Sequence, residues 1–195
     1  MQSYAKGSCS IFLFQAILTV AFSRAPRRLA REAGYEDCLS AAKTSWQRAQ
    51  LLYDFGIEKS PLIVLQGCIL LHIAYAAVKQ SRDYRFWFAT AMRVATHIGL
   101  HKHHTIQNVS KPVSKLFRRI WAFMYYEDVF VTCAGFKNVR SIHDDECDIA
   151  DIRESDWEDD LEAEDVVKGS VETARLHRLY FIHVSRLSKI GQYNY

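Results

Sequence analysis

The sequence predicts an all-α, multi-helix, bundle-like domain. Of its 195 residues, 49% are hydrophobic and 13% are aromatic, so the chain is too apolar for a disordered protein. It has only 3 prolines and 8 glycines, which are too few turn residues for a sandwich of many short strands. The length suits one domain, so we expect a single helical domain over 1–195 with about six helices and an acidic loop before the last one.

The first expected helix covers 10–23 and is apolar on nearly all sides, as is typical of a central helix. Its apolar run is also similar to the hydrophobic part of a secretory signal. The run is too short to span a bilayer, and no clean small-x-small cleavage site follows it. A buried helix is therefore our preferred interpretation, and a secreted helical protein with an N-terminal signal is an alternative.

The next two helices are expected over 35–55, which is amphipathic and followed by Gly56, and from Pro61 to about residue 79. Ser60 and Pro61 form a typical N-cap and first-turn pair. The apolar run after them is too long for a buried strand, which decides for a helix. No later stretch reaches 18 uninterrupted apolar residues, so we expect no membrane span.

The second half of the sequence predicts two long helices, then an acidic loop and a last helix. Asp83 can cap a helix that stops at Gly99, and Pro112 opens a helix over 113–133 that Gly135 ends. An acidic loop over 144–170 follows. The last helix is expected within 171–195, with its apolar stripe over 176–190.

The charge of the chain is unevenly distributed. Residues 144–165 hold 13 of the 22 acidic residues and one base, Arg153, whereas 24 basic and 9 acidic residues lie outside. Such a distribution steers partners or folds back on itself. We prefer the second interpretation, in which the acidic segment neutralises the basic body.

The cysteines and histidines are the first candidates for metal chemistry. The five cysteines form no C-x-x-C pair and fit neither a zinc ribbon nor a disulfide framework, which favours a reduced intracellular protein. His97 and His101 have the spacing of a metalloprotease helix, but Ile98 stands where the glutamate base belongs, and Gly99 should break the helix. We therefore expect no metal, cofactor or catalytic residue in this chain. A helical metal-dependent enzyme using His97 and His101 is the alternative.

Three stretches follow one another along the chain: AMRVATHIGLHKH, FRRIWAFMYYEDVFVTCAGF and IHDDECDI. Together they resemble the regulatory domain of fungal zinc binuclear cluster transcription factors, called the fungal-specific transcription factor domain, middle homology region or xylanolytic-activator regulatory domain. The resemblance is best over 11–150. Its signature residues are Arg93, Ala95, Gly99, Leu100, His101, Arg119, Trp121, Asp128, Gly135 and Asp148.

The resemblance implies a non-enzymatic, all-α regulatory module of a nuclear transcription factor. The implied partners are regulatory proteins or a small effector, and DNA through a zinc cluster that is not present in this chain. A homodimer is compatible with it. We expect the chain to be truncated relative to the family, with zinc confined to the missing DNA-binding domain. We also expect Arg93, Arg119 and Asp128 to form a polar tie between two helices.

Overall fold

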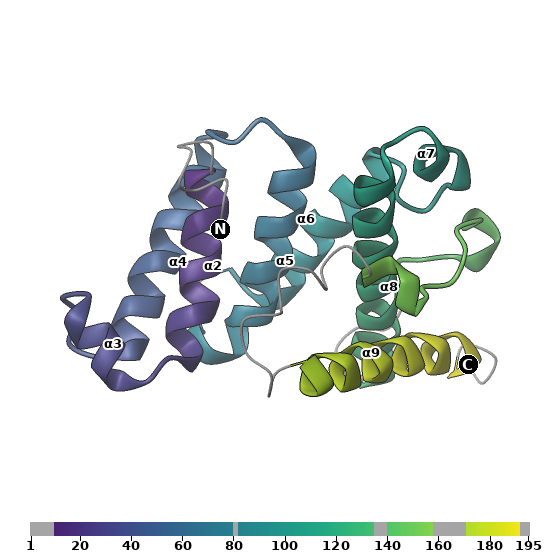
Figure 1. Ribbon diagram of the computed structural model, residues 1–195. Coiled ribbons are helices and arrows are strands. Elements are labelled where there is room, and N and C mark those ends of the chain that lie inside the picture. Colours follow the sequence, from purple (N-terminus) through teal and green to yellow (C-terminus); the bar gives the residue numbers. More distant parts are fainter. Residues whose placement is uncertain (1–9, 80–81, 135–139, 158–170, 192–195) are drawn as a thin grey trace. The chain divides into compact units, whose positions relative to one another are not determined.

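The computed structural model describes residues 10–79, 82–134, 140–157 and 171–191 (Figure 1). Every regular element in these ranges is a helix, which confirms the all-α prediction. The chain divides into two compact units, Met1–Ile98 (unit 1) and Gly99–Tyr195 (unit 2). This division concerns packing alone, so the expectation of a single domain stays a prediction.

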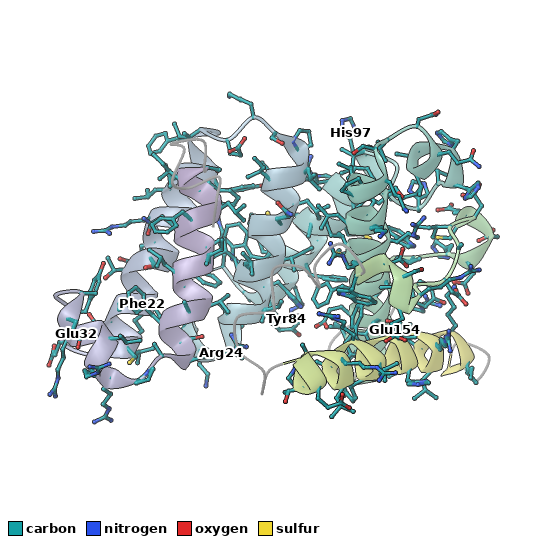
Figure 2. The ribbon with its side chains drawn as sticks, viewed as in Figure 1. Phe22, Arg24, Glu32, Tyr84, His97 and Glu154 are labelled. Carbon is teal, nitrogen blue, oxygen red and sulfur yellow. The ribbon has the colours of Figure 1, made fainter. Side chains whose placement is uncertain are left out.

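Unit 1 contains five described helices. They are α2 (Ile11–Arg24), α3 (Arg27–Glu32), α4 (Cys38–Asp54), α5 (Pro61–Val78) and α6 (Tyr84–His97). Helix α2 packs against both α4 and α5, and α5 packs in turn against α6. Side chains fill the space between these helices (Figure 2), and the largest fully buried ones are Trp46, Trp87 and Phe12.

Side-chain caps fix where the helices of unit 1 begin. Asp37 Oδ1 accepts a hydrogen bond from Ser40 N at 2.7 Å, so α4 begins at Cys38, three residues later than the sequence predicted. Asp83 Oδ1 accepts one from Phe86 N at 3.0 Å, which is the predicted cap of α6. Each carboxylate satisfies a backbone N–H that has no partner within its helix.

Helices α2 and α5 form the apolar centre of unit 1. A Cβ atom on Gly67 of α5 would lie 2.1 Å from the Phe12 ring of α2, so only glycine allows this close approach. By length and composition alone, α5 could cross a membrane, but a packed core helix passes the same test. Because α2 buries Phe12 and Ala16 against its neighbours, the structure favours the buried-helix interpretation of 10–23.

Unit 2 contains α7 (His103–Gln107), α8 (Lys111–Cys133), the 3-10 turn η1 (Asp144–Glu146) and α9 (Val171–Gly191). Helix α8 packs against α9 and against α7. The sequence did not predict α3 and α7, because helices of five or six residues are too short to show an apolar period. His103 and His104 begin α7.

Candidate functional site

Two stretches that carry the family resemblance meet in unit 2, although more than 40 residues separate them in sequence. His101 O accepts a hydrogen bond from Asp148 N at 3.2 Å, and His103 N donates to Asp148 Oδ1 at 2.6 Å. Lys102 Nζ donates to the carbonyl oxygen of Glu146 at 2.7 Å. We call this pairing of 101–103 with 146–148 the signature clasp.

The residues around the clasp explain its local sequence. Gly99 has a φ of +74°, and a Cβ atom there would lie 2.6 Å from Thr105 Oγ1, so a larger residue would be both strained and crowded. Leu100 is fully buried. The His101 ring lies 5.7 Å from the Trp121 ring of α8, measured between centroids. A glycine turn, a buried leucine and a ring contact thus hold this side of the clasp.

The charges of the clasp are complementary near neutral pH. Burial lowers the pKa of His101, and the neighbouring Lys102 charge lowers it further, so the imidazole is neutral. The hydrogen bond from His103 N holds the pKa of Asp148 below its usual value, so this carboxylate is charged. Protonation of Asp148 therefore acts against the clasp, whereas protonation of His101 opposes the burial of its ring.

Asp128 of α8 holds the chain that leads into the acidic segment. Its carboxylate is fully buried and accepts hydrogen bonds from Ser141 N at 2.9 Å and Ile142 N at 3.0 Å. The Arg140 guanidinium lies 3.6 Å from the same carboxylate. A buried charge is tolerated because it is paired and hydrogen-bonded in this way. Asp128 therefore fixes 140–142 on α8.

Asp156 makes a second anchor further along the segment. Its side chain is only 3% exposed, and it accepts hydrogen bonds from Arg118 Nε of α8 at 2.7 Å and from Arg153 N at 2.9 Å. Ile152, four residues earlier in the chain, is also buried. The sequence analysis placed Asp156 in an acidic loop and did not predict this anchoring role. The isoleucines and Trp157 among the acids were the available signal.

Other acids of the segment also meet basic residues, as the fold-back interpretation predicts. Asp151 pairs with Lys189 of α9, and Glu154 lies 3.4 Å from Arg175 of the same helix. The pair of Glu154 and Arg175 is exposed and contributes little stability by itself. The described part of the acidic segment is thus held between α8 and α9 rather than free in solvent.

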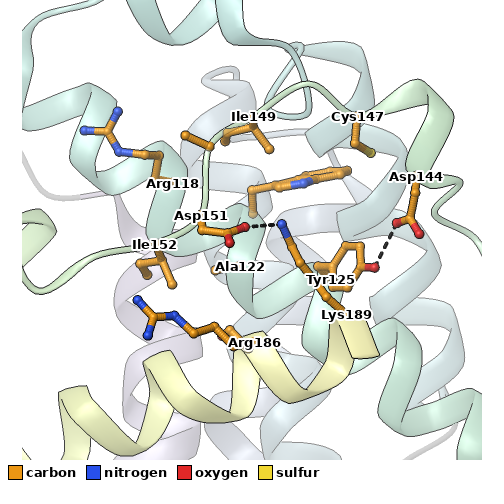
Figure 3. Close-up of a pocket in the computed structure, with 13 residues that line it drawn as sticks. Arg118, Ala122, Tyr125, Asp144, Cys147, Ile149, Asp151, Ile152, Arg186 and Lys189 are labelled. Carbon is orange, nitrogen blue, oxygen red and sulfur yellow. Dashed lines mark hydrogen bonds and ion pairs between the residues drawn. The ribbon is translucent and has the colours of Figure 1, made fainter. Parts of the chain in front are cut away.

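A cavity of 190 Å³ lies between α8, the acidic segment and α9 (Figure 3). Tyr125 and Asp144 border it and are joined by a hydrogen bond of 2.8 Å between Tyr125 Oη and Asp144 Oδ1. The remaining lining residues are apolar, basic or small, apart from the acidic Asp151. They are Arg118, Trp121, Ala122, Cys147, Ile149, Ala150, Asp151, Ile152, Ser185, Arg186 and Lys189.

The ionisable hydroxyl and thiol of the cavity remain protonated. Burial and the hydrogen bond to Asp144 raise the pKa of Tyr125 to about 12. Burial and the Asp144 charge raise the pKa of Cys147 to about 11. A thiol attacks as its thiolate, so neither environment activates a nucleophile. Tyr125 and Cys147 thus border the cavity as neutral polar groups.

The candidate metal ligands are not gathered into a site in the described part of the chain. No group of three histidine, cysteine or acidic side chains there could hold a metal ion. Helix α6 ends at His97, and Gly99 follows in the left-handed conformation. The four described cysteines are free thiols. The expected absence of a metal and a cofactor stays a prediction.

The remaining signature residues are distributed over both units. Ala95 is buried in α6, and Arg93 is exposed on the same helix of unit 1. In unit 2, Arg119 Cζ lies 5.9 Å from the centre of the Trp157 ring. The bonds of Asp128 given above lie within unit 2, so its predicted tie with Arg93 and Arg119 stays a prediction. Gly135 lies outside the described residues.

The signature clasp of this helical fold thus brings together two of the three stretches that resemble the regulatory domain. The profile of the fungal specific transcription factor domain matches residues 1–190. The chain therefore belongs to this family, as the three sequence stretches predicted. Its members are transcription factors and not enzymes, so the metal-enzyme alternative is not favoured.

Similar proteins are fungal regulators. The chain is 30% identical to cutinase transcription factor 1 beta of Fusarium vanettenii, over 82% of this chain and 18% of that protein. It is 31% identical to the fusaric acid cluster transcription factor FUB12 of Gibberella fujikuroi, over 83% of this chain and 24% of that protein. An acetamidase regulatory protein of Aspergillus fumigatus is 26% identical to the chain, over 94% of this chain and 21% of that protein.

The chain thus spans less than a quarter of the length of these relatives. No solved structure matches it.

Proposed function

We propose that the chain is the regulatory, non-DNA-reading part of a nuclear transcription factor. In this proposal another part of the protein, a zinc cluster, reads DNA, and this chain sets the transcriptional output in response to a small effector or a regulatory protein. Family membership supports the class of function. The proposed zinc, nuclear location and partners follow from the resemblance of the signature residues to those of zinc-cluster regulators.

The signature clasp carries this proposal. It joins the helix stop around Gly99 to the acidic segment, which in turn borders the cavity between α8 and α9. Occupation of the cavity would bias the position of a segment that Asp128, Asp156 and the clasp hold at three points. A ligand shifts the equilibrium between a held and a released position of this segment only if it binds the two with different affinities.

A reporter fusion tests the proposal. The 195-residue chain would be placed between a heterologous DNA-binding domain and an activation domain, with a flexible linker of equal length as the reference. We expect the chain to change reporter output by about fivefold or more, the lower end of typical allosteric coupling. Asp128→Ala should return the output toward the linker value, because it releases the acidic segment, whereas the exposed Asp145→Ala should not.

Equal output from the chain and the linker, at equal nuclear protein levels, would contradict the proposal. If Asp128→Ala and Asp145→Ala changed the reporter output equally, the regulatory effect would not depend on the anchoring of the acidic segment by Asp128. Both readings use the same fusion and the same reporter.

A further inference from the structure

The cavity of unit 2 contains one basic side chain that is not committed to another residue. Three bases and two carboxylates line it, but Lys189 pairs with Asp151, and Arg118 pairs with Asp156. Arg186 has neither an ion pair nor a hydrogen bond within the part of the chain that the structure describes. Figure 3 shows Arg186 and Lys189 extending from α9, with Lys189 directed at Asp151.

The neighbouring residue on α9 supplies an independent observation. Ser185 lines the cavity and is only 7% exposed. Its hydroxyl is buried and has no hydrogen-bond partner in the described part of the chain. A buried hydroxyl without a partner costs free energy, so such groups call for an explanation. Rotation of the Ser185 side chain toward the cavity would let a bound acceptor satisfy this hydroxyl.

The rest of the lining fits an apolar group of limited size. Trp121 and Ala122 of α8 and Ile149 and Ile152 of the acidic segment supply apolar surface. An apolar cavity of about 150 Å³ is known to bind benzene. The 190 Å³ of this cavity therefore suits a single ring or a short alkyl chain with one polar end.

We propose that this cavity binds a small monocarboxylate with an apolar body, whose carboxylate is bound by Arg186 and Ser185. An arginine guanidinium matches a carboxylate through two parallel N–H···O bonds. A ligand with several negative charges fits less well, because Asp144 and Asp151 also border the cavity. This inference rests on the proposed function, because it names the chemical class of the small effector to which the chain would respond.

Binding to the complete 195-residue chain tests the proposal with four probes. Benzoate and hexanoate supply the carboxylate, and benzamide and hexanamide supply neutral groups of nearly the same shape. Calorimetry and ligand-observed NMR would measure each dissociation constant. We expect saturable binding of both carboxylates, at least about tenfold tighter than of the matching amides, because a charged hydrogen bond is stronger than a neutral one.

Arg186→Gln should weaken carboxylate binding by about tenfold and leave amide binding nearly unchanged. The matched control is Arg27→Gln, which removes the same charge from an exposed arginine of unit 1 and should change neither affinity. Ala122→Phe should fill the cavity and abolish binding of all four probes. Thermal unfolding checks that each variant folds, and Arg186→Gln remains informative if Ala122→Phe does not.

Three results would overturn the inference: no saturable binding, as for a cavity that holds only water; equal affinities for acids and amides; or equal effects of Arg186→Gln and Arg27→Gln. The reporter fusion separates this inference from the proposed function. Regulation without probe binding would reject the cavity ligand alone. Probe binding without any effect of the chain on the reporter would reject the regulatory function alone.

Discussion

The two units of the chain are stabilised by different interactions. Unit 1 is built around fully buried apolar side chains such as Trp46 and Trp87, whose rings meet edge to face at 5.8 Å. Unit 2 holds its acidic segment through the buried carboxylates of Asp128 and Asp156. Apolar burial does not depend directly on pH, whereas the hydrogen bonds of a carboxylate weaken when the carboxylate is protonated.

This difference between the two units indicates where a regulatory change can act. A segment held by a few polar contacts has discrete points at which it can be released, because breaking one leaves a buried charge unpaired. An apolar helix bundle lacks such points, since its stability is spread over many small contacts. We therefore expect unit 1 to act as the stable part and unit 2 as the responsive part.

The largest expected effect is in unit 1. Trp46→Ala removes a fully buried ring that lies against Trp87 and Tyr75, and should lower the free energy of unfolding by about 4 kcal/mol. Hydrogen exchange followed by mass spectrometry should show lost protection in α4 and α6. Leu51→Ala, on the exposed side of α4, is the control and should change little. Equal effects would mean that the aromatic cluster is not the core of unit 1.

The second effect is in unit 2. Asp128→Ala leaves Ser141 N, Ile142 N and Arg140 without their carboxylate, and should cost about 3 kcal/mol of stability. Exchange should accelerate at 141–142 more than in α2 or α4. Asp145→Ala is the matched control, because this carboxylate is exposed. If both variants lose the same stability, Asp128 is not the anchor described here.

A smaller effect is expected at the helix stop before the clasp. Gly99→Ala combines a left-handed backbone with crowding against Thr105, and should cost about 2 kcal/mol. Gly34→Ala has a similar φ of +86° but no neighbouring atom within 4 Å, so it should cost about 1 kcal/mol. Chemical denaturation measures both. Equal costs would show that the contact with Thr105 is unimportant.

The smallest effect is the response of the clasp to pH. Burial of its ring holds the pKa of His101 below the ordinary value for histidine, so the unfolded chain binds more protons, and stability falls as the pH drops below that ordinary value. Asp148, whose folded pKa lies below 3.8, adds a further loss at more acidic pH. Amide exchange of His103 between pH 7 and pH 5 measures the first step. His101→Phe should remove this step, and its persistence would assign the titration to another group.

The helices could be predicted well from the sequence because their signals are local. Asp83 caps α6 as predicted, and Gly99 has the positive φ that its place after an apolar period suggested. The short helix α7 was not predicted, since a five-residue helix has no visible period. Tertiary contacts, such as the hydrogen bond between His103 N and Asp148 Oδ1, give this segment its position.

The sequence by itself determined that this protein is helical, that its acids gather in one segment, and which family it belongs to. All three depend on residue types and on spacings of a few positions along the chain. The tertiary structure decided which acids are buried, that His101 lies against Trp121, and that Arg186 and Ser185 border a cavity. Such pairings join residues that are distant in sequence, such as Arg118 and Asp156, and no local pattern encodes which charge meets which partner.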